Sequence, residues 1–249
     1  MQIAGSVAIV TGGTGGLGRR ICRALAEQGA SVAVVYGRSQ DVADTVVAEL
    51  SELGARAVAV QADVSRQADV QSLVERTLGE FGRVDILVND AAYNQWIAYK
   101  DLDALTLEVW EKMLRTNTTG PFLCMKAVAP HMLRQQRGRI VNVASIAGLV
   151  PSGSSIAYAV SKAALIHLTR CMAVALAPHV LVNCVAPGTM EGTRMTANLD
   201  PAYVQRGLQG TLTGQFTGKD DVAAQVLTFI KSGSTTGQTV CVDGGRVFH

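Results

Sequence analysis

The sequence predicts an α/β fold in which helices cover both faces of a parallel sheet. Short runs rich in β-branched residues alternate along the chain with longer segments whose apolar residues recur every three or four positions, which is the spacing of amphipathic helices. The short runs are apolar throughout rather than at every second position, as expected for strands buried on both faces. A doubly wound parallel sheet with right-handed crossovers accounts for both observations.

The first expected strand is a short apolar run that leads through a glycine-rich turn into an amphipathic helix, and this alternation continues to the end of the chain. The seven expected strands are Ser6–Val10, Ser31–Tyr36, Ala57–Val60, Val84–Val88, Arg139–Ala144, Leu181–Val185 and Thr239–Val242. The expected helices are Leu17–Gln28, Gln40–Leu53, Gln67–Phe81, Leu107–Gln135, Ile156–Ala177 and Lys219–Ser232. No linker or charge run divides these elements, so we expect a single domain over residues 1–249.

The segment 187–218 is the one long stretch without a clean apolar period. It contains several glycines and threonines together with Met190, Met195, Leu199 and Tyr203. A connection of that length in a compact domain is usually functional. Because ligands in open α/β sheets bind beyond the carboxyl ends of the strands, we expect this segment to be a substrate lid.

Composition and charge exclude several classes of protein. The chain is 48% hydrophobic and 17% charged, with a formal net charge of +2, so it resembles neither a disordered chain nor a nucleic-acid binder with clustered cations. It has no apolar run long enough to span a bilayer and no export signal before the first strand. The five cysteines are widely separated, which favours a cytoplasmic protein with reduced cysteines and no metal cluster.

A glycine-rich turn, Thr11-Gly12-Gly13-Thr14-Gly15-Gly16-Leu17-Gly18, joins the first strand to the first helix. Glycines let the backbone turn tightly and approach a ligand, and the free N–H groups at a helix start favour a phosphate there. Both the GxGxxG and the TGxxxGxG patterns occur in this turn, within the strand–turn–helix context that dinucleotide binding requires. We therefore predict a nicotinamide dinucleotide site in a Rossmann-type domain.

The end of the second expected strand indicates which dinucleotide is preferred. A protein that binds the free ribose 2′-hydroxyl of NAD(H) has an Asp or Glu about twenty residues after the glycine turn. Arg38 and Ser39 stand there instead, and both can hydrogen-bond to a 2′-phosphate. We predict NADP(H) as the preferred cofactor, with NAD(H) as the alternative.

Ser145, Tyr158 and Lys162 form a candidate catalytic group. Ser145 follows the fifth expected strand, and Tyr158 and Lys162 lie four residues apart on one face of the helix that follows. A nearby ammonium lowers the pKa of a phenol, so we expect Tyr158 to donate or accept a proton near neutral pH. Ser145 can orient a carbonyl oxygen.

These residues resemble the short-chain dehydrogenase/reductase family, and the resemblance covers essentially the whole chain. The further motifs that carry it are Asp63-Val64, Asn89-Asp90-Ala91-Ala92, Asn117, Pro187-Gly188 and Val242-Asp243-Gly244-Gly245. By this resemblance, Tyr158 is the general acid in reduction and Lys162 binds the nicotinamide ribose. Ser145 holds the substrate oxygen, and Asn117 holds a water in the proton relay. The resemblance implies hydride transfer between a nicotinamide and a carbonyl carbon, without a metal.

The resemblance also implies a cofactor site. Its expected residues are Gly12, Thr14, Gly15, Gly16, Leu17, Gly18, Arg38, Ser39, Asp63, Val64, Asn89, Ala91, Tyr158, Lys162, Pro187, Gly188 and Met190. Two positions depart from the family pattern. Asp90 stands where Asn is usual, which puts a carboxylate near the cofactor. Thr14-Gly15 stands where members that prefer NADP usually have a basic residue, so the predicted preference depends on Arg38 and Ser39.

The nearest branch of the family is that of 3-oxoacyl-carrier-protein reductases and related polyketide reductases, through Ile140–Ser145 and Thr236–Val240. Members that dock an acyl carrier protein tend to have an Arg-Gly turn where this chain has Pro178-His179. An acyl carrier protein nevertheless stays among the expected partners. A basic cluster is either its contact or a solvated helix end: Arg134, Arg137 and Arg139. The residues expected to bind substrate are Asn94, Trp96, Ser145, Pro151, Ser152 and Tyr158.

Two other functions are compatible with these residues. The same four catalytic candidates would serve an alcohol or sugar dehydrogenase that works in the oxidative direction, and the fold also permits a cofactor-sensing binding protein. Family members commonly form homotetramers through two long helices, here 107–135 and 156–177. The apolar surplus of the second helix fits either a subunit contact of this kind or a central helix that is buried within one subunit.

Overall fold

The computed structural model describes residues 1–197 and 199–248 and contains the predicted seven-stranded sheet. All of its strands are parallel, in the order β3-β2-β1-β4-β5-β6-β7. The strands are β1 (Val7–Thr11), β2 (Ser31–Tyr36), β3 (Ala57–Gln61), β4 (Ile86–Asn89), β5 (Gly138–Val143), β6 (Val180–Pro187) and β7 (Thr239–Val242). The strand order reverses between β1 and β4, and ligands bind at such a switch point.

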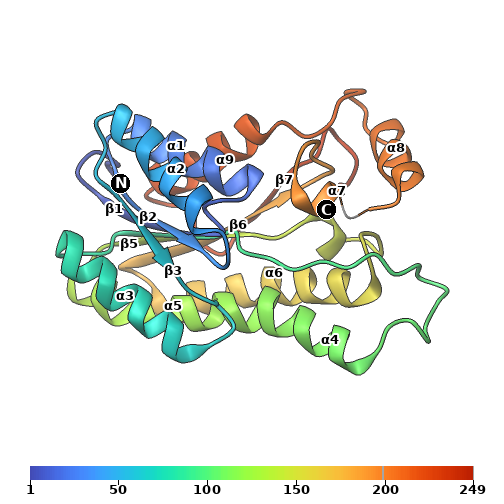
Figure 1. Cartoon of the computed structure of the whole chain (residues 1–249), viewed down its shortest axis with the longest axis horizontal. Helices are drawn as coiled ribbons and strands as arrows, with labels where there is room; N and C mark the ends of the chain where they lie inside the picture. Colours follow the sequence, from blue (N-terminus) through green and yellow to red (C-terminus); the bar gives the residue numbers. More distant parts are fainter. Residues whose placement is uncertain (198, 249) are drawn as a thin grey trace.

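Helices cover both faces of the sheet (Figure 1), which confirms the doubly wound fold. One layer consists of α1 (Gly16–Glu27), α2 (Gln40–Glu52) and α9 (Lys219–Lys231). The other consists of α3 (Gln67–Phe81), α4 (Leu107–Leu114), α5 (Gly120–Arg134) and α6 (Ile156–Leu176). Each layer has its own buried core against the sheet, with Leu25 of α1 in the first and Met125 of α5 in the second.

The predicted helix 107–135 is interrupted near its middle. Between α4 and α5 the chain forms a π-helical turn, Arg115–Thr119, whose one buried residue is Asn117. Pro121 follows in the first turn of α5, where a residue without an N–H is tolerated. Single π-turns within helices often occur at functional sites. Here the turn directs a candidate catalytic residue towards the interior.

The segment predicted as a lid is more regular than its composition indicated. It contains α7 (Arg194–Ala197) and α8 (Pro201–Gln209), and residue 198 lies outside the described residues. Asp200 caps α8, because its Oδ1 accepts the N–H groups of Ala202 and Tyr203 at 2.7 and 3.2 Å. An acidic cap followed by proline is a recognisable helix start. Figure 1 shows both helices beyond the end of the sheet, near β7.

Among the described residues, α6 is the one helix long and apolar enough to cross a membrane by length and composition. It packs against β6 within a helix layer (Figure 1), and it carries Tyr158 and Lys162. These contacts identify it as a core helix of the α/β domain.

Candidate active site

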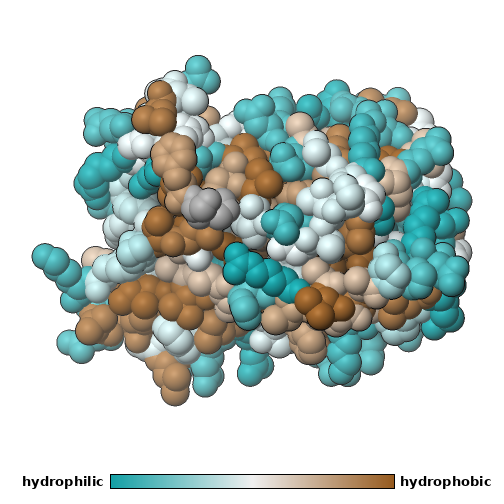
Figure 2. Space-filling view, turned by 180° about the vertical axis from the view of Figure 1, so that it is seen from behind, coloured by the Kyte–Doolittle hydropathy of each residue, from teal (hydrophilic) through white to brown (hydrophobic). Residues whose placement is uncertain are grey.

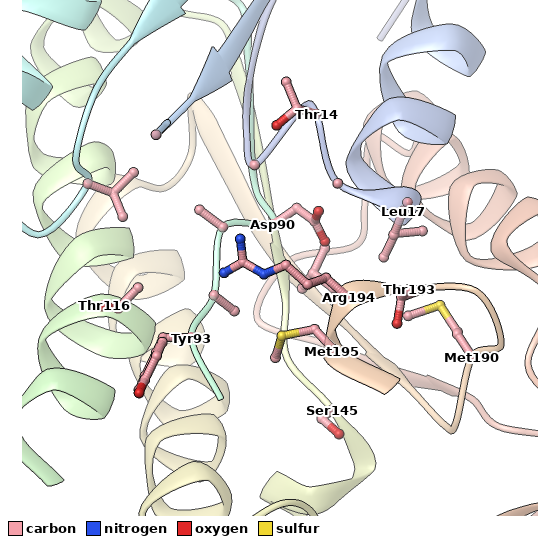
Figure 3. A pocket seen from close by; sticks show the side chains of 18 of the residues that line it. Thr14, Leu17, Asp90, Tyr93, Thr116, Ser145, Met190, Thr193, Arg194 and Met195 are labelled. Atoms are coloured by element: carbon pink, nitrogen blue, oxygen red, sulfur yellow. The ribbon is translucent and has the colours of Figure 1, made fainter. Parts of the chain in front are cut away.

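A cavity of about 630 Å³ lies at the carboxyl ends of the strands, where the glycine turn, the strand-end loops and the lid segment meet (Figure 3). Most of the predicted cofactor residues line it: Gly12, Thr14, Gly15, Gly16, Leu17, Arg38, Ser39, Asp63, Val64, Ala91, Tyr158, Lys162, Pro187, Gly188 and Met190. Ser145 lines it too. The fold thus brings the predicted dinucleotide site and the predicted catalytic residues into one cavity.

The glycine turn has no space for side chains. A Cβ on Gly18 would lie 2.1 Å from the carbonyl oxygen of Gly12, and one on Gly12, whose φ is +69°, would lie 2.9 Å from the nitrogen of Ala91. The helix that follows has no side-chain cap and no acidic residue in its first turn. The N–H of Gly18 faces the Asp90 carboxylate, and the N–H groups before it in the first turn are available to an anion, so the turn fits the pyrophosphate of a dinucleotide.

Two predicted cofactor residues do not line the cavity. Gly18 lies beneath the turn, where its missing Cβ allows the close approach just described. Asn89 is buried at the end of β4 and donates its Nδ2 hydrogen to Oδ1 of Asn142 at 2.8 Å. Both residues shape the site from behind its surface.

Arg38 and Ser39 are exposed at the end of β2 and line the cavity. Asp63 and Asp90 are the two carboxylates among the described residues that line it. The Oδ1 atom of Asp63 accepts the N–H and the hydroxyl of Ser65 at 2.9 and 2.7 Å. The Asp63 carboxylate is thus held in its own loop, and the loop after β2 carries a cation, Arg38.

Lys162 and Ser145 are held close to Tyr158 by backbone contacts. The Lys162 ammonium donates to the carbonyl of Val143 at 2.8 Å and lies 5.7 Å from the centre of the Tyr158 ring. Ser145 begins a 3-10 turn and accepts the N–H of Ala147 at 3.2 Å. A Cβ on Gly148 in this turn would lie 2.6 Å from the carbonyl carbon of Lys162. Glycine there allows the turn to pack closely on α6.

Asn117 lies behind the cavity rather than on its wall. Its Nδ2 donates to the carbonyl of Tyr93 at 2.9 Å and to Oγ of Ser161 at 3.0 Å, while its Oδ1 accepts the N–H of Tyr93 at 2.8 Å. Ser161 in turn donates to the carbonyl of Tyr158 at 2.7 Å. The Asn117 side chain therefore ties the loop after β4 to the helix that carries Tyr158.

Burial raises the pKa of Tyr158 to about 12, although the facing Ser145 hydroxyl acts in the opposite direction. The expected net lowering of the Tyr158 pKa beside Lys162 is therefore wrong for this structure, because burial has the largest effect. The phenol is withdrawn from water, which disfavours its anion, and the ammonium is held by Val143. Burial also lowers the pKa of Lys162 to about 8. At neutral pH Tyr158 carries its proton, as a proton donor must.

Asp90 lies between the glycine turn and Lys162. Its Oδ2 atom would be 3.0 Å from a Cβ on Gly18, and Figure 3 shows its side chain at the pocket wall. Burial raises the pKa of Asp90 to about 7, against the opposite effects of the Lys162 ammonium and the Gly18 backbone. The residue that departs from the family pattern is thus a titratable group inside the site.

The cavity also has wall residues that we did not predict. Arg194 of α7 points into the pocket (Figure 3). Lys112 of α4 lines it too, with its ammonium 4.3 Å from the centre of the Tyr93 ring. No local pattern in the sequence indicates these cations, because their positions depend on how α4 and the lid segment pack against the strand ends.

Four predicted substrate residues lie beside the cavity rather than on its wall, and they contact the lid or its neighbouring loops. Asn94 donates its Nδ2 hydrogen to the carbonyl of Met195 at 2.9 Å. The rings of Trp96 and Tyr203 are 5.1 Å apart between centroids. The carbonyl of Ser152 accepts the Tyr99 hydroxyl at 2.6 Å. Pro151, before it, is exposed.

Metal binding has no candidate cluster in the described part of the chain, residues 1–197 and 199–248: no group of three or more His, Cys, Asp or Glu side chains could hold an ion there. The cavity wall instead combines glycines, hydroxyl groups and cations. Such a set of donors fits a phosphate-bearing cofactor and a neutral oxygen of a substrate.

Comparison with known proteins shows which family and which relatives the chain resembles. The family model for short chain dehydrogenases matches residues 6–203. A protein named as a ketoacyl reductase of the granaticin polyketide synthase of Streptomyces violaceoruber is 41% identical over 241 residues, which cover 96% of this chain and 95% of that protein. A 3-oxoacyl-[acyl-carrier-protein] reductase of a Synechocystis species is 39% identical over 251 residues, with 97% and 96% covered.

The fold comparison agrees with the sequence comparison. A solved structure described as a short-chain alcohol dehydrogenase from Sinorhizobium meliloti superimposes with a TM-score of 0.90 at 31% identity, covering 98% of this chain and 96% of that one. The relatives support ketoreductase activity and a cofactor of the NAD(P) type. With the family match over most of its length, this chain belongs to the short-chain dehydrogenase/reductase family and is an oxidoreductase that acts on CH–OH and C=O groups.

Proposed function

We propose that the enzyme is an NADPH-dependent carbonyl reductase that reduces a ketone, of the 3-oxoacyl thioester or polyketide type, with Tyr158 as the general acid. One observation carries this proposal: Ser145, Tyr158 and Lys162 line the same cavity as the glycine turn. A group that binds a carbonyl oxygen and a group that protonates it therefore lie next to the place where a nicotinamide dinucleotide fits.

In this mechanism the protein binds and protonates the substrate oxygen. The hydroxyls of Ser145 and Tyr158 hydrogen-bond to the ketone oxygen, which draws electrons away from the carbonyl carbon. A reduced nicotinamide cofactor held in the cavity would supply a hydride to that carbon. As the C=O π electrons move to the oxygen, Tyr158 transfers its proton there and an alcohol forms. The Lys162 ammonium then stabilises the phenolate that remains on Tyr158.

The protonation of Tyr158 favours the reductive direction over the oxidative alternative. An alcohol dehydrogenase needs Tyr158 as a base, in its anionic form. Burial raises the pKa of this phenol to about 12, so the proton-donor form dominates near neutral pH. The resting protonation state therefore suits reduction, in which Tyr158 gives up its proton.

Arg38 and Ser39 support NADP(H) as the preferred cofactor. The Arg38 guanidinium is exposed at the cavity edge, at the end of β2. A guanidinium is a good partner for a phosphate, whereas an NAD(H) site has a carboxylate at this position.

The names of the relatives support a thioester-linked ketone as substrate, because two of them are reductases of ketoacyl or acyl-carrier-protein-linked compounds. Hydrophobic residues gather at the end of the molecule that carries the lid helices (left in Figure 2), in keeping with a partly apolar substrate. The proposed contact with a carrier protein has less support, because two of the three arginines of the basic cluster make contacts within the chain. Arg137 pairs with Asp85 and donates to Ser6, and Arg139 donates to Ser232, which leaves Arg134 as the outward cation of the cluster.

A homotetramer in the cytoplasm completes the proposal. Large apolar side chains are exposed on α5 and α6, the helices of the expected subunit contact, and include Phe122, Val160 and Val174, the last 84% exposed. The described cysteines are all free, in keeping with a reducing compartment.

The test is an assay of NADPH oxidation with the purified enzyme. An acetoacetyl thioester, a diketone, a quinone and a simple ketone are compared as substrates, and the corresponding alcohols are supplied with NADP⁺ in the reverse direction. We expect the highest kcat/KM with the acetoacetyl thioester. Oxidation of a simple alcohol or sugar without ketone reduction would reject the proposal and support the oxidative dehydrogenase instead.

A further inference from the structure

Tyr203, on lid helix α8, has a fixed position that the proposed mechanism does not explain. Its backbone N–H is held by the capping carboxylate of Asp200 at 3.2 Å. Its ring contacts that of Trp96, with centroids 5.1 Å apart and planes tilted by 57°, a geometry that favours aromatic pairs. Two independent contacts therefore orient this phenol.

The hydroxyl of Tyr203 lies beside the general acid. It accepts the N–H of Gly153 at 2.7 Å. Gly153 itself touches the Tyr158 ring: a Cβ built on it would lie 3.0 Å from Cδ1 of Tyr158, and its φ of +103° also favours glycine. Tyr203 is among the groups that raise the pKa of Tyr158, as expected for two hydroxyls in one neighbourhood.

The Tyr203 hydroxyl retains a hydrogen that can be donated. A phenol can accept one hydrogen bond and donate another. Here the oxygen accepts from Gly153, and among the described residues no acceptor is within hydrogen-bonding distance of its hydrogen. Tyr99, the neighbouring phenol, is different, because it already donates to the carbonyl of Ser152 at 2.6 Å.

We propose that Tyr203 is a positioning residue of the reductase, which donates a hydrogen bond to a second carbonyl oxygen of the substrate. This inference rests on the proposed function. With the ketone oxygen on Ser145 and Tyr158, the second carbonyl carbon of a 1,3-dicarbonyl compound lies two carbons further along the chain. We assign its oxygen to Tyr203, which lies beside the cavity wall and reaches the neighbourhood of Tyr158 through Gly153. The site would then select 3-oxoacyl thioesters over ketones with one carbonyl.

A neutral acceptor suits this position better than a carboxylate. Among the described residues, the Tyr203 side chain contacts the Trp96 ring and the Gly153 backbone, and the phenols of Tyr99 and Tyr158 lie near it. None of these is a cation, and a buried anion without a cation is costly. A thioester carbonyl, which carries no charge, is therefore the second acceptor that we assign.

The experiment compares two substrates that differ in one carbonyl. The first is the acetoacetyl thioester of N-acetylcysteamine, and the second is its thioether analogue, in which a CH₂ group replaces the thioester carbonyl. Tyr203→Phe keeps the ring against Trp96 and removes the hydroxyl. Tyr99→Phe is the matched control, since it removes a nearby phenol that has no free hydrogen. NADPH binding and the circular dichroism spectrum are measured for each variant.

We expect Tyr203→Phe to lower kcat/KM for the thioester about fivefold to tenfold, mainly through KM, as for loss of one hydrogen bond. The kcat/KM for the thioether analogue should change less than about twofold. Binding of the 3-hydroxy thioester product should weaken by the same factor as kcat/KM, which gives a readout apart from turnover. Tyr99→Phe should affect both substrates equally.

Two results would overturn the inference. An equal loss on both substrates in Tyr203→Phe would mean that Tyr203 only supports the Gly153 loop, and no loss on either would mean that its hydroxyl does not contact the substrate. Failure of the inference and failure of the proposed function give different results. If the proposed function is wrong, the unaltered enzyme reduces neither compound, and the inference about Tyr203 is rejected together with that function.

Discussion

Asp90→Asn should stabilise the protein, and the gain should grow as the pH rises. The pKa of this carboxyl is raised from 3.8 to about 7 in the folded chain. Between these values the folded state binds more protons than the unfolded state, so the stability of the unaltered protein falls with rising pH in this window. Asparagine has nearly the same shape and no charge, so the variant lacks this loss.

The magnitude follows from the shift in pKa. One pKa unit corresponds to about 1.4 kcal/mol, so the rise from 3.8 to about 7 sets a ceiling of about 4 kcal/mol. The carboxylate lines an open cavity, where water screens its charge, and we expect about half of the ceiling, about 2 kcal/mol, above about pH 7. For a chain of this length that gain raises Tm by about 4 to 8 °C.

Thermal unfolding followed by circular dichroism from about pH 4 to about pH 8 measures this effect. The difference in Tm between Asp90→Asn and the unaltered protein should be near zero at the acid end and largest at the alkaline end. Asp220→Asn is the control, because the Asp220 side chain is 73% exposed and pairs with Arg20 at the surface, where such a pair contributes little. A Tm difference that does not change with pH, or an unaltered protein that is the more stable above about pH 7, would refute this reasoning.

Two further predictions concern the cofactor. Gly18→Ala should abolish NADPH binding, because its Cβ would lie 2.1 Å from the Gly12 carbonyl oxygen. Gly79→Ala is the control and should leave binding unchanged, because a Cβ there has nothing within 4 Å. Fluorescence titration of NADPH measures both variants, and tight binding by Gly18→Ala would contradict the assignment of the turn. Arg38→Ala should weaken NADPH at least about tenfold and NADH less than about twofold, because only NADPH has the phosphate that a guanidinium binds. Equal losses for the two cofactors would reject the role of Arg38.

The sequence predicted the framework well because its signals are local. Each of the seven strands is a short apolar run, and their predicted and observed ends differ by at most two residues. The glycine turn and the Tyr158–Lys162 spacing are also local patterns, and both residues of that pair lie on the cavity wall.

The predictions that failed or were incomplete depend on contacts between distant segments. Apolar spacing continues through 107–135, so periodicity alone could not show that a π-turn directs Asn117 towards Tyr93 and Ser161. The spacing of Tyr158 and Lys162 predicts that they are neighbours. The pKa of the phenol, however, depends mainly on burial, and the spacing of residues along a helix does not indicate how deeply a side chain is buried. Residues of the lid segment reach the site through α7 and the loop before it.

The role of Tyr158 as proton donor is the central claim, and turnover of Tyr158→Phe tests it most directly. The variant keeps the ring and removes only the hydroxyl, so NADPH should bind within about twofold of its original affinity. General acid catalysis contributes about 100-fold to 10,000-fold, so kcat with an acetoacetyl thioester should fall by at least about 100-fold. A variant that binds NADPH normally and retains kcat within about tenfold would contradict the mechanism proposed for this site.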